Sequence, residues 1–286
     1  MMNGMCKSMN FSEELRNFLL ARGITSYAVM PFDRCAVWNA SLLARNFPSE
    51  KDKPQSALLL LLPYYTEDHP ERNVSLYAVP RDYHLFSKTL FAELQAFLES
   101  CFPGELFRGF ADHSPIDERK AFSAAGLGVI GDNSLLITQE YGSYVFLAEV
   151  ISTLPVASWE QTTAISTDKG CFHCGKCKDI CPMESLSGCL SYLTQQKGDL
   201  SPETIAAMKR YHTVWGCDLC QTVCPMNSNI KPTPIPFFKE QLLPTVTAEM
   251  IDAMPPELFE ERAFAWKKKK TILRNIAAVE ETKEET

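Results

Sequence analysis

The sequence has no long hydrophobic run. Its longest, "ALLLLL" at residues 57–62, is stopped by Pro63 and is far shorter than the roughly 20 residues of a membrane-spanning helix. Residues 1–20 contain neither an apolar stretch followed by a small-residue cleavage site nor a twin-arginine pair, so no export signal is predicted. These absences predict a soluble cytoplasmic protein without a membrane segment, in which thiols stay reduced.

The sequence also gives little reason to expect disulfides, although it contains 11 cysteines. Small secreted proteins use disulfides because their cores are too small to be stable alone, whereas this chain has 286 residues, of which 45% are hydrophobic. In a reducing compartment, clustered cysteines indicate metal binding or catalysis instead.

Most of the cysteines fall in two motifs. The segment "CFHCGKCKDICP" (171–182) has the spacing C-x2-C-x2-C-x3-C-P, and "CDLCQTVCP" (217–225) repeats the end of that pattern. This spacing is typical of paired iron–sulfur clusters, in which three thiolates of one motif bind one cluster and the fourth binds its neighbour. Structural zinc is the alternative, but it usually uses two well-separated ligand pairs.

The spacing therefore predicts two 4Fe–4S clusters that exchange ligands. Seven of the predicted ligands come from the motifs, and Cys189 in "SGCLSYLT" is the candidate for the eighth. The first set is Cys171, Cys174, Cys177 and Cys224, and the second is Cys181, Cys189, Cys217 and Cys220. Cys6, Cys35 and Cys101 are left without a role because isolated cysteines are usually small buried side chains.

Two neighbouring clusters form an electron relay, and a relay needs an acceptor. About 165 residues precede the first motif, so we expect the acceptor site there. Hydrophobic periodicity and turn residues predict a mixed arrangement of elements in this part. Helices are expected at 11–23, 80–101 and 117–126, strands at 24–32, 56–63 and 106–112, and a hairpin at 133–153 that turns near Tyr141 and Gly142, with Ser12 capping the first helix and Gly23 closing it.

The predicted fold class is α/β (α+β) with three parts. Residues 1–165 form a mixed α/β domain, and 166–230 form a bacterial-ferredoxin-like domain with two 4Fe–4S clusters. Residues 231–286 form a proline-rich connector followed by one or two short helices.

Three groups of residues in the first part are candidates for chemistry, and each has an ordinary explanation. Asp112 follows a predicted strand in "ADHSPIDER", where it could face a cleft or cap the next helix. The glycines of "AGLGVIGDNSLL" could let a flat ligand approach the backbone, or they could serve turns. The polar segment "RDYH" at 81–84 could line a pocket or cap a helix.

The order of these segments resembles the epoxyqueuosine reductase family. The resemblance rests on "YAVPRDYH", "DHSPIDERKAFSAAGLGVIGDNSLLI", "GSYVFLAEV", the first cysteine motif, "CLSYLT", "GCDLCQTVCPMN" and "ILRNIA". It covers roughly residues 75–280, and Cys189 occupies the position of a cluster ligand in that family.

The resemblance implies a cobalamin-dependent iron–sulfur reductase that converts epoxyqueuosine to queuosine in tRNA. Electrons would pass through the two 4Fe–4S clusters to a base-off cobalamin and give Co(I), while Asp112 would act as general acid and so must carry a proton near neutral pH. The implied cobalamin-binding residues are Tyr83, His84, Gly126, Gly128, Gly131, Asn133 and Ser134.

The resemblance also implies partners, and the sequence departs from the family in some places. The tRNA anticodon arm is the expected substrate, flavodoxin or ferredoxin the expected electron donor, and the chain resembles a short form without the C-terminal helical repeats. Asp132 replaces a basic residue often found after "IG". The net charge is −7, so RNA binding would require a local basic face, for which "WKKKK" (266–270) and Arg274 are the candidates.

Two other functions remain open at this point. The first is a cobalamin-dependent reductase of another small substrate, similar to reductive dehalogenases. These usually carry a twin-arginine signal and use a different proton donor, so Asp112 favours the tRNA enzyme. The second is a non-catalytic electron carrier with two clusters, which would have little use for Asp112 and the glycine-rich loop.

Overall fold

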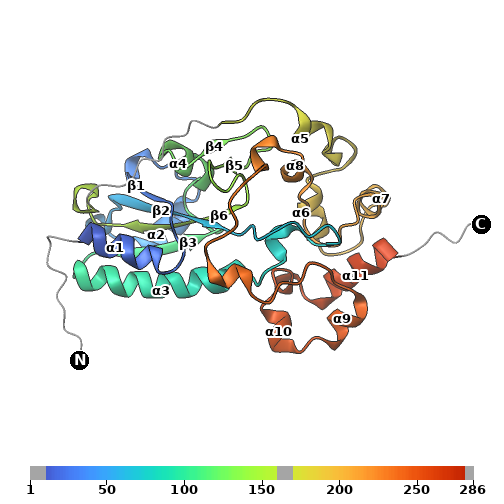
Figure 1. Ribbon diagram of the computed structural model, residues 1–286. Coiled ribbons are helices and arrows are strands. Elements are labelled where there is room, and N and C mark those ends of the chain that lie inside the picture. Colours follow the sequence, from blue (N-terminus) through green and yellow to red (C-terminus); the bar gives the residue numbers. More distant parts are fainter. Residues whose placement is uncertain (1–10, 160–169, 281–286) are drawn as a thin grey trace, which may run out of the picture.

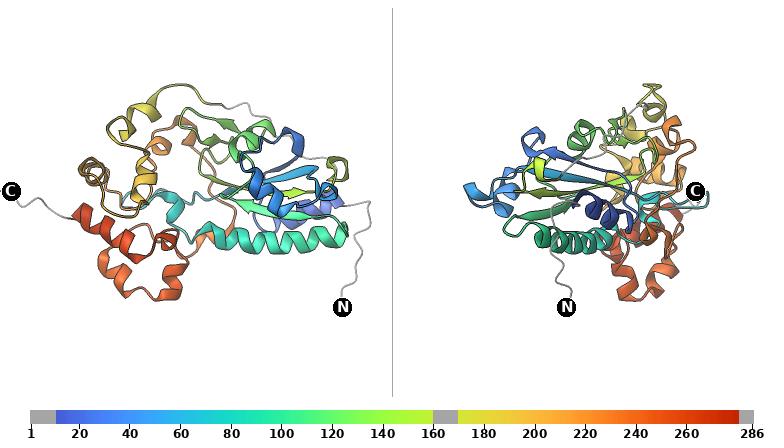
Figure 2. Two further views of the ribbon diagram at one scale, coloured as in Figure 1. Left: turned by 180° about the vertical axis from the view of Figure 1, so that it is seen from behind. Right: turned by 60° about the vertical axis from the view of Figure 1, so that its left-hand side comes forward.

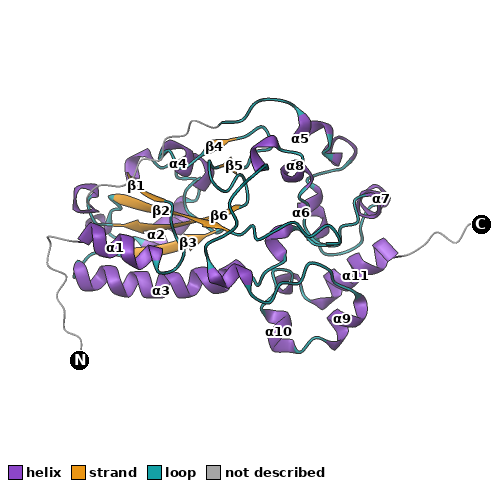
Figure 3. Ribbon diagram, in the orientation of Figure 1, coloured by secondary structure: helices purple, strands orange, loops and turns teal. Residues whose placement is uncertain are grey.

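The computed structural model describes residues 11–159 and 170–280 (Figure 1). Within these ranges a four-stranded sheet is covered by helices, and two helical segments lie beyond one end of it (Figure 3). The helices of the first range are α1 (Phe11–Leu20), α2 (Ala40–Asn46), α3 (Tyr83–Cys101) and α4 (Glu118–Ala124). Those of the second are α5 (Lys176–Asp179), α6 (Leu190–Thr194), α7 (Pro202–Arg210), α8 (Leu219–Thr222), α9 (Ala248–Ala253), α10 (Pro256–Glu260) and α11 (Lys269–Glu280).

The central sheet has the order β1-β2-β6-β3, and every neighbouring pair is antiparallel. Its strands are β1 (Tyr27–Pro31), β2 (Ser56–Pro63), β3 (Phe107–Ala111) and β6 (Val145–Ser152). A separate small hairpin pairs β4 (Val129–Ile130) with β5 (Leu136–Ile137). The predicted mixture of helices and strands is confirmed, with an entirely antiparallel central sheet.

Hydrophobic side chains fill both faces of the central sheet, which explains the "ALLLLL" run. Leu58, Leu60 and Leu62 of β2 pack on one face with residues of α1 and α3, while Leu59 and Leu61 pack on the other with α2 and α4. Because successive side chains of a strand point to opposite faces, a strand buried on both sides must be apolar throughout. Figure 2 shows the resulting three layers.

Two local predictions were wrong. Ser12 does not cap α1, since it lies inside a helix that the structure describes from Phe11. The expected hairpin at 133–153 turns at the predicted place, where Thr138 bridges Gly142, but its two arms separate. The first arm pairs with β4, and the second enters the central sheet as β6, because its long apolar segment is buried best between β2 and β3.

The C-terminal residues complete the core that α1 and α3 begin. Ile235, Phe264 and Ile276 belong to the same buried cluster as Leu15 and Leu94. The helix expected near 117–126 begins at Glu118. One or two helices were predicted at the C-terminal end, and the structure has α10 and α11 there, preceded by a further short helix, α9. Among the helices of the described ranges, none is both long enough and apolar enough to cross a bilayer.

Candidate active site and cysteine centres

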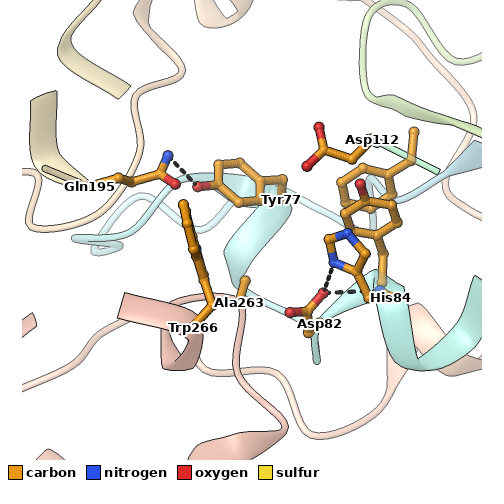
Figure 4. Close-up of a pocket in the computed structure, with 9 residues that line it drawn as sticks. Tyr77, Asp82, His84, Asp112, Gln195, Ala263 and Trp266 are labelled. Atoms are coloured by element: carbon orange, nitrogen blue, oxygen red, sulfur yellow. Dashed lines mark hydrogen bonds and ion pairs between the residues drawn. The ribbon is translucent and has the colours of Figure 1, made fainter. Parts of the chain in front are cut away.

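A cavity of about 520 Å³ lies where the central sheet, the cysteine-containing segment and the C-terminal segment meet (Figure 4). Asp112 lies on its wall, just after β3, and Gln195 enters from the end of α6. The full set of lining residues is Tyr77, Asp82, Tyr83, His84, Asp112, Phe146, Gln195, Ala263 and Trp266. Three regions far apart in the sequence therefore contribute to one site.

Asp112 sits in a strained backbone conformation. Its φ is +66°, and the His113 N–H donates to the Ala111 carbonyl at 2.8 Å, which closes a three-residue turn around the aspartate. Such turns are rare because a positive φ crowds Cβ, and strained residues cluster at functional sites. The Asp112 turn presents its carboxylate to the cavity (Figure 4). The helix-cap explanation of Asp112 was wrong, since Asp117 caps α4 by accepting from the Lys120 N–H.

The polar segment at 81–84 both caps a helix and lines the cavity. Asp82 caps α3 by accepting from the His84 N–H at 2.9 Å, and it also contacts the His84 Nδ1 at 2.8 Å. This hydrogen bond to Asp82 is the main reason why the pKa of His84 is raised. The Tyr83 ring stacks on Phe146 with centroids 4.0 Å apart, and burial, followed by the nearby Asp112 charge, raises the pKa of its phenol.

The glycine-rich loop has local reasons for its glycines. A Cβ on Gly128 would lie 2.7 Å from the Ile137 carbonyl oxygen, and one on Gly131 would lie 2.6 Å from Ile137 Cδ1. Gly126 has a φ of +77° just after α4, and the carbonyl of Ser134 accepts from Arg119. The proposed contact of these residues with cobalamin stays a prediction. Asn133 also lies beside three of the cysteines, Cys171, Cys174 and Cys177.

The first predicted cysteine set lines a single cavity. Its members Cys171, Cys174, Cys177 and Cys224 lie there with Asp132 and Asn133. His173 Nδ1 lies 2.9 Å from Asp132 Oδ1. Ligand atoms of Asp132, Cys171 and His173 lie within 4.8 Å of one another, so the rim of this cavity adds polar groups next to the thiols.

The second predicted set is also gathered in space. Burial raises the pKa of Cys217 and Cys220 to about 12, and the charges of Cys181 and Cys189 add to the rise. The two motifs meet where α5 contacts α8. Metal binding requires thiolates, and four thiolates held together in a half-buried site need compensating positive charge, which iron supplies.

Buried polar side chains fasten the second motif to the sheet domain. The Asp218 carboxylate accepts from the Leu76 N–H at 2.6 Å and from the Ser75 hydroxyl, and it pairs with Arg72 at 3.5 Å. Asn227 accepts from the Ser143 N–H at 2.8 Å. The polar residues within and just after the second motif, Asp218 and Asn227, therefore serve to attach it to the sheet domain.

The C-terminal motif "ILRNIA" fastens α11 to the segment between the cysteine motifs. Buried Asn275 donates to the carbonyls of Thr194 and Val214, both at 2.7 Å. Arg274 donates to the carbonyl of Gln196 at 2.8 Å and to that of Gly198. The Arg274 guanidinium is therefore engaged by protein carbonyls at the expected basic face.

Three lysines of that face line a surface hollow of about 380 Å³ together with Lys197 and Asp199. We call this site the lysine hollow. The lysines that line it are Lys197, Lys267, Lys268 and Lys270, and Arg274 lies beside them. Lys269 does not line it and donates to the Met254 carbonyl at 3.2 Å. Trp266 lies next to them, with the Lys267 Nζ 3.9 Å from its ring centroid, and this tryptophan also lines the Asp112 cavity. The lysine hollow and the cavity are thus adjacent.

The sequence analysis missed a pair of carboxyl groups behind the Asp112 turn. Glu149 of β6 is fully buried, and its Oε1 accepts from the Ser114 hydroxyl. Burial raises the pKa of Glu118 to about 7, with the Asp112 charge adding to the rise. Burial and the charge of Glu118 raise the pKa of Glu149 well above its ordinary value. The available signal was a lone acid in the otherwise apolar strand "VFLAEVIS".

Two family models match the chain. Residues 170–227 match the 4Fe-4S double cluster binding domain, and residues 49–113 match the model described as epoxyqueuosine reductase QueG, DUF1730. The first match favours iron–sulfur clusters over zinc at the two cysteine sets.

Curated relatives cover most of the chain. The epoxyqueuosine reductase of Leadbetterella byssophila is 34% identical over 252 residues, which is 80% of this chain and 78% of that protein. The enzyme of Gloeobacter violaceus is 35% identical over 187 residues, 60% of this chain and 56% of the relative. The match to the Lactococcus garvieae enzyme likewise spans 57% of that relative's length, so this chain spans little more than half of several relatives.

Solved structures share the fold. Epoxyqueuosine reductase from Streptococcus thermophilus has a TM-score of 0.71 at 23% identity, covering 95% of this chain and 81% of that one. An epoxyqueuosine reductase in complex with a tRNA-Tyr epoxyqueuosine-modified stem loop has a TM-score of 0.74 at 23% identity, covering 96% and 81%. The Bacillus subtilis enzyme, with a catalytic aspartate loop swung out of its active site, has a TM-score of 0.74 at 24% identity, covering 96% and 82%.

Proposed function

The chain belongs to the epoxyqueuosine reductase family, and on this premise we propose that it reduces epoxyqueuosine to queuosine in tRNA. The observation that carries the proposal is the Asp112 turn, which places a carboxyl group in a cavity bordered by Gln195 of the segment between the cysteine motifs. An acid, a ligand-sized cavity and two thiol sets in one region are the parts that a proton-coupled reduction requires.

The residues of the Asp112 cavity fit a large planar cofactor such as cobalamin. A second cavity of about 220 Å³ shares Tyr83, Asp112 and Phe146 with it, and the stacked rings of Tyr83 and Phe146 offer an apolar surface. These residues, with His84, would hold the cofactor, which when bound would supply a strongly reducing cobalt centre. Glycines 126, 128 and 131 remain proposed contacts.

The protein's own part is binding, positioning and proton transfer. The two cysteine sets would hold the 4Fe–4S clusters that supply electrons, and flavodoxin or ferredoxin is the proposed donor. We assign residues 1–165 to cofactor binding and catalysis, 166–230 to the clusters and 231–286 to the connector and C-terminal helices. The predicted boundary near residue 165 lies outside the described residues.

Asp112 would hold a proton at its carboxyl group and donate it to the epoxide oxygen as the C–O bond breaks.

Binding of the tRNA anticodon arm is part of the same proposal. A solved structure of the same fold holds a tRNA stem loop, and the lysine hollow lies beside Trp266 at the edge of the Asp112 cavity. Because the whole chain carries a charge of −7, phosphate contacts must be local, and four lysines in one hollow provide them. Trp266, with 60% of its surface exposed, is available to stack on an unpaired base.

An anaerobic turnover assay tests the proposed function. The cluster- and cobalamin-loaded chain is incubated with a reductant and an epoxyqueuosine-containing anticodon stem loop, and nucleosides are analysed by mass spectrometry. We expect loss of one oxygen atom from the modified nucleoside. A loaded protein that leaves the nucleoside unchanged, with either this stem loop or whole tRNA, would contradict the proposal.

Asp112→Asn tests the assigned acid within this assay. Asparagine tolerates a positive φ, so the turn, the clusters and the cofactor should be retained, while turnover should fall by at least about 100-fold because the proton donor is gone. Asp252→Asn, at an exposed position of α9, is the matched control and should be as active as the unmodified chain. Unchanged turnover in Asp112→Asn would remove Asp112 as the acid.

A further inference from the structure

The Glu118–Glu149 pair joins a half-buried carboxyl group, Glu118, to a fully buried one, Glu149. Each is hydrogen-bonded to the loop that carries the acid, Glu118 to the Asp112 backbone and Glu149 to the Ser114 hydroxyl. Glu149 faces the apolar cluster that contains Leu59, Phe110 and Ile151. Charges are rarely buried without a cation, because their desolvation is costly and apolar replacements often give equal or greater stability. A function therefore has to be sought for the pair.

The geometry of the pair indicates a shared proton. Glu118 Oε1 and Glu149 Oε2 are both buried, and neither has a hydrogen-bond donor among the described residues. Each group nevertheless influences the protonation of the other through a side-chain hydrogen bond. One proton between the two carboxyl groups satisfies both contacts, and such a pair loses its protons in two coupled steps.

A single short loop joins this pair to the acid. Asp112 forms the strained turn, Ser114 donates to Glu149, and Asp117 caps the helix whose first residue is Glu118. Glu149 lies opposite Phe110 in the register between β6 and β3, two residues before Asp112. Asp112 and Glu118 also line one cavity of about 220 Å³, which is large enough for a bridging water molecule.

Other titratable groups near the pair are acids or neutral groups. Asp112 and Asp117 interact with Glu118, while the Tyr83 phenol interacts with both glutamates, and the Cys35 thiol interacts with Glu149. The nearby cations are occupied elsewhere: Arg119 donates to the Ser134 carbonyl, and Lys120 pairs with Asp117 at 3.2 Å. The surroundings therefore favour proton retention by the pair.

The proposed reaction needs more protons than Asp112 can carry. Removal of an epoxide oxygen as water, leaving a carbon–carbon double bond, consumes two electrons and two protons. The first proton goes to oxygen as one C–O bond breaks, and the second goes to the resulting hydroxyl group as the other C–O bond breaks and water leaves. Asp112 carries one proton and must be reprotonated within the turnover, in a cavity that the substrate covers.

We propose that the Glu118–Glu149 pair stores the second proton and returns it to Asp112 within each turnover. This inference rests on the proposed function. The pair does not touch the substrate, so its members act through Asp112 as proton-storing and positioning residues. Glu149 holds the proton deep in the sheet, and Glu118 passes it to Asp112 through the cavity that they share.

Infrared titration tests the storage of the proton without turnover. The anaerobically purified full chain, with its clusters and cobalamin, is titrated while the C=O band of protonated carboxyl groups is recorded. We expect one band that persists at neutral pH and is lost in Glu149→Gln, and a second that titrates near neutrality and is lost in Glu118→Gln. Absence of both bands at neutral pH in the unmodified chain would overturn the proposal.

Turnover kinetics tests the return of the proton. Glu118→Gln should lower kcat at least about tenfold with little change in KM, the loss should grow as pH rises, and a small weak acid in the buffer should restore part of the rate. A purely structural role would give no rescue by the acid. Unchanged kcat and pH profile in Glu118→Gln, in an otherwise active enzyme, would overturn the storage role alone.

The infrared and turnover results together distinguish failure of the proposed function from failure of the proton-storage proposal. An unmodified chain that shows both infrared bands but converts no epoxyqueuosine overturns the proposed function, and the role of the pair in it. If Glu149→Gln does not fold, Ser114→Ala replaces it. The Ser114 hydroxyl lowers the pKa of Glu149, so its removal should move the persistent band to higher pH, and an unmoved band would contradict the assignment to Glu149.

Discussion

At the scale of single residues, the site is a group of acids that lie in different surroundings, and burial raises the pKa of two of them, Glu118 and Glu149. Asp112 is presented by a strained turn, and the carboxyl groups of Glu118 and Glu149 each have a buried oxygen without a hydrogen-bond donor in the described part of the chain. Asp82, by contrast, is engaged by His84 at 2.8 Å. Residues of one chemical type thus take different roles because their surroundings differ.

The buried pair predicts a pH dependence of stability. The pKa of Glu118 rises from its ordinary 4.5 to about 7 in the folded chain, so between these values the folded state binds more protons than the unfolded state. Stability should therefore fall as pH rises through this range, by up to about 3 kcal/mol for this group. Urea unfolding of the unmodified chain and Glu118→Gln, measured from pH 4.5 to pH 7, gives the difference.

A second variant serves as the control for the urea unfolding of Glu118→Gln. Glu257→Gln changes an exposed glutamate of α10 and should leave the pH dependence as it is. Equal slopes in the unmodified chain and Glu118→Gln would mean that Glu118 is an ordinary surface acid.

The sequence identified some of these residues and could not identify others. Asp112 and the eight cysteines could be proposed from the sequence because local motifs and their order along the chain point to them. Glu149 was missed because its importance comes from burial and from Glu118, which lies 31 positions earlier in the chain. Contacts of that kind arise only when β6 is inserted between β2 and β3.

At the scale of elements, the cysteine motifs are held in place by close contacts with the loop before β6. Gly142 has a φ of +56°, and a Cβ there would lie 2.0 Å from Asn227 Oδ1. Asn227 in turn accepts from the Ser143 N–H. The contact between residue 142 and Asn227 requires a glycine for two reasons. The backbone has a positive φ, and there is no space for a Cβ.

Gly142→Ala should therefore loosen the second motif. We expect a loss of stability of more than about 2 kcal/mol and a lower iron content, because the clash with Asn227 adds to the cost of a positive φ. Gly104→Ala is the control, since Gly104 has a φ of +96° with no atom within 4 Å of the added Cβ. Equal losses of stability and iron in the two variants would contradict a special role for the contact with Asn227.

Predictions for the elements succeeded where the signal is local. The apolar run of β2 and the periodicity of α3 gave both elements correctly. The separation of the arms at 133–153 was not predictable, because strand partners depend on distant residues such as Leu59 and Phe110. Ser12 was misassigned since a capping side chain and an exposed helical serine look alike in sequence.

At the scale of the whole molecule, three regions converge on the Asp112 cavity, and the lysine hollow extends from its edge. Trp266 belongs to both. The core shared by Leu15, Phe264 and Ile276 joins the C-terminal segment to the sheet. The molecule is acidic as a whole, yet four of its lysines gather beside the site.

The lysine hollow predicts salt-dependent RNA binding. The double variant Lys267→Ala and Lys270→Ala should weaken binding of an anticodon stem loop and reduce the slope of log K against log salt by about 1 to 2, as two phosphate contacts are lost. Lys51→Ala with Lys53→Ala removes the same charge from exposed positions before β2 and should change neither value. Equal effects of the two double variants would place the RNA elsewhere.

The most direct measurement is the metal content of the chain after anaerobic purification with added cobalamin, together with its absorption spectrum. We expect about eight irons, for two 4Fe–4S clusters, and one cobalt per chain, with a corrinoid spectrum that changes when the clusters are reduced. Eight irons without cobalt would contradict the assignment of the Asp112 cavity to a cofactor, and the chain would then be an electron carrier.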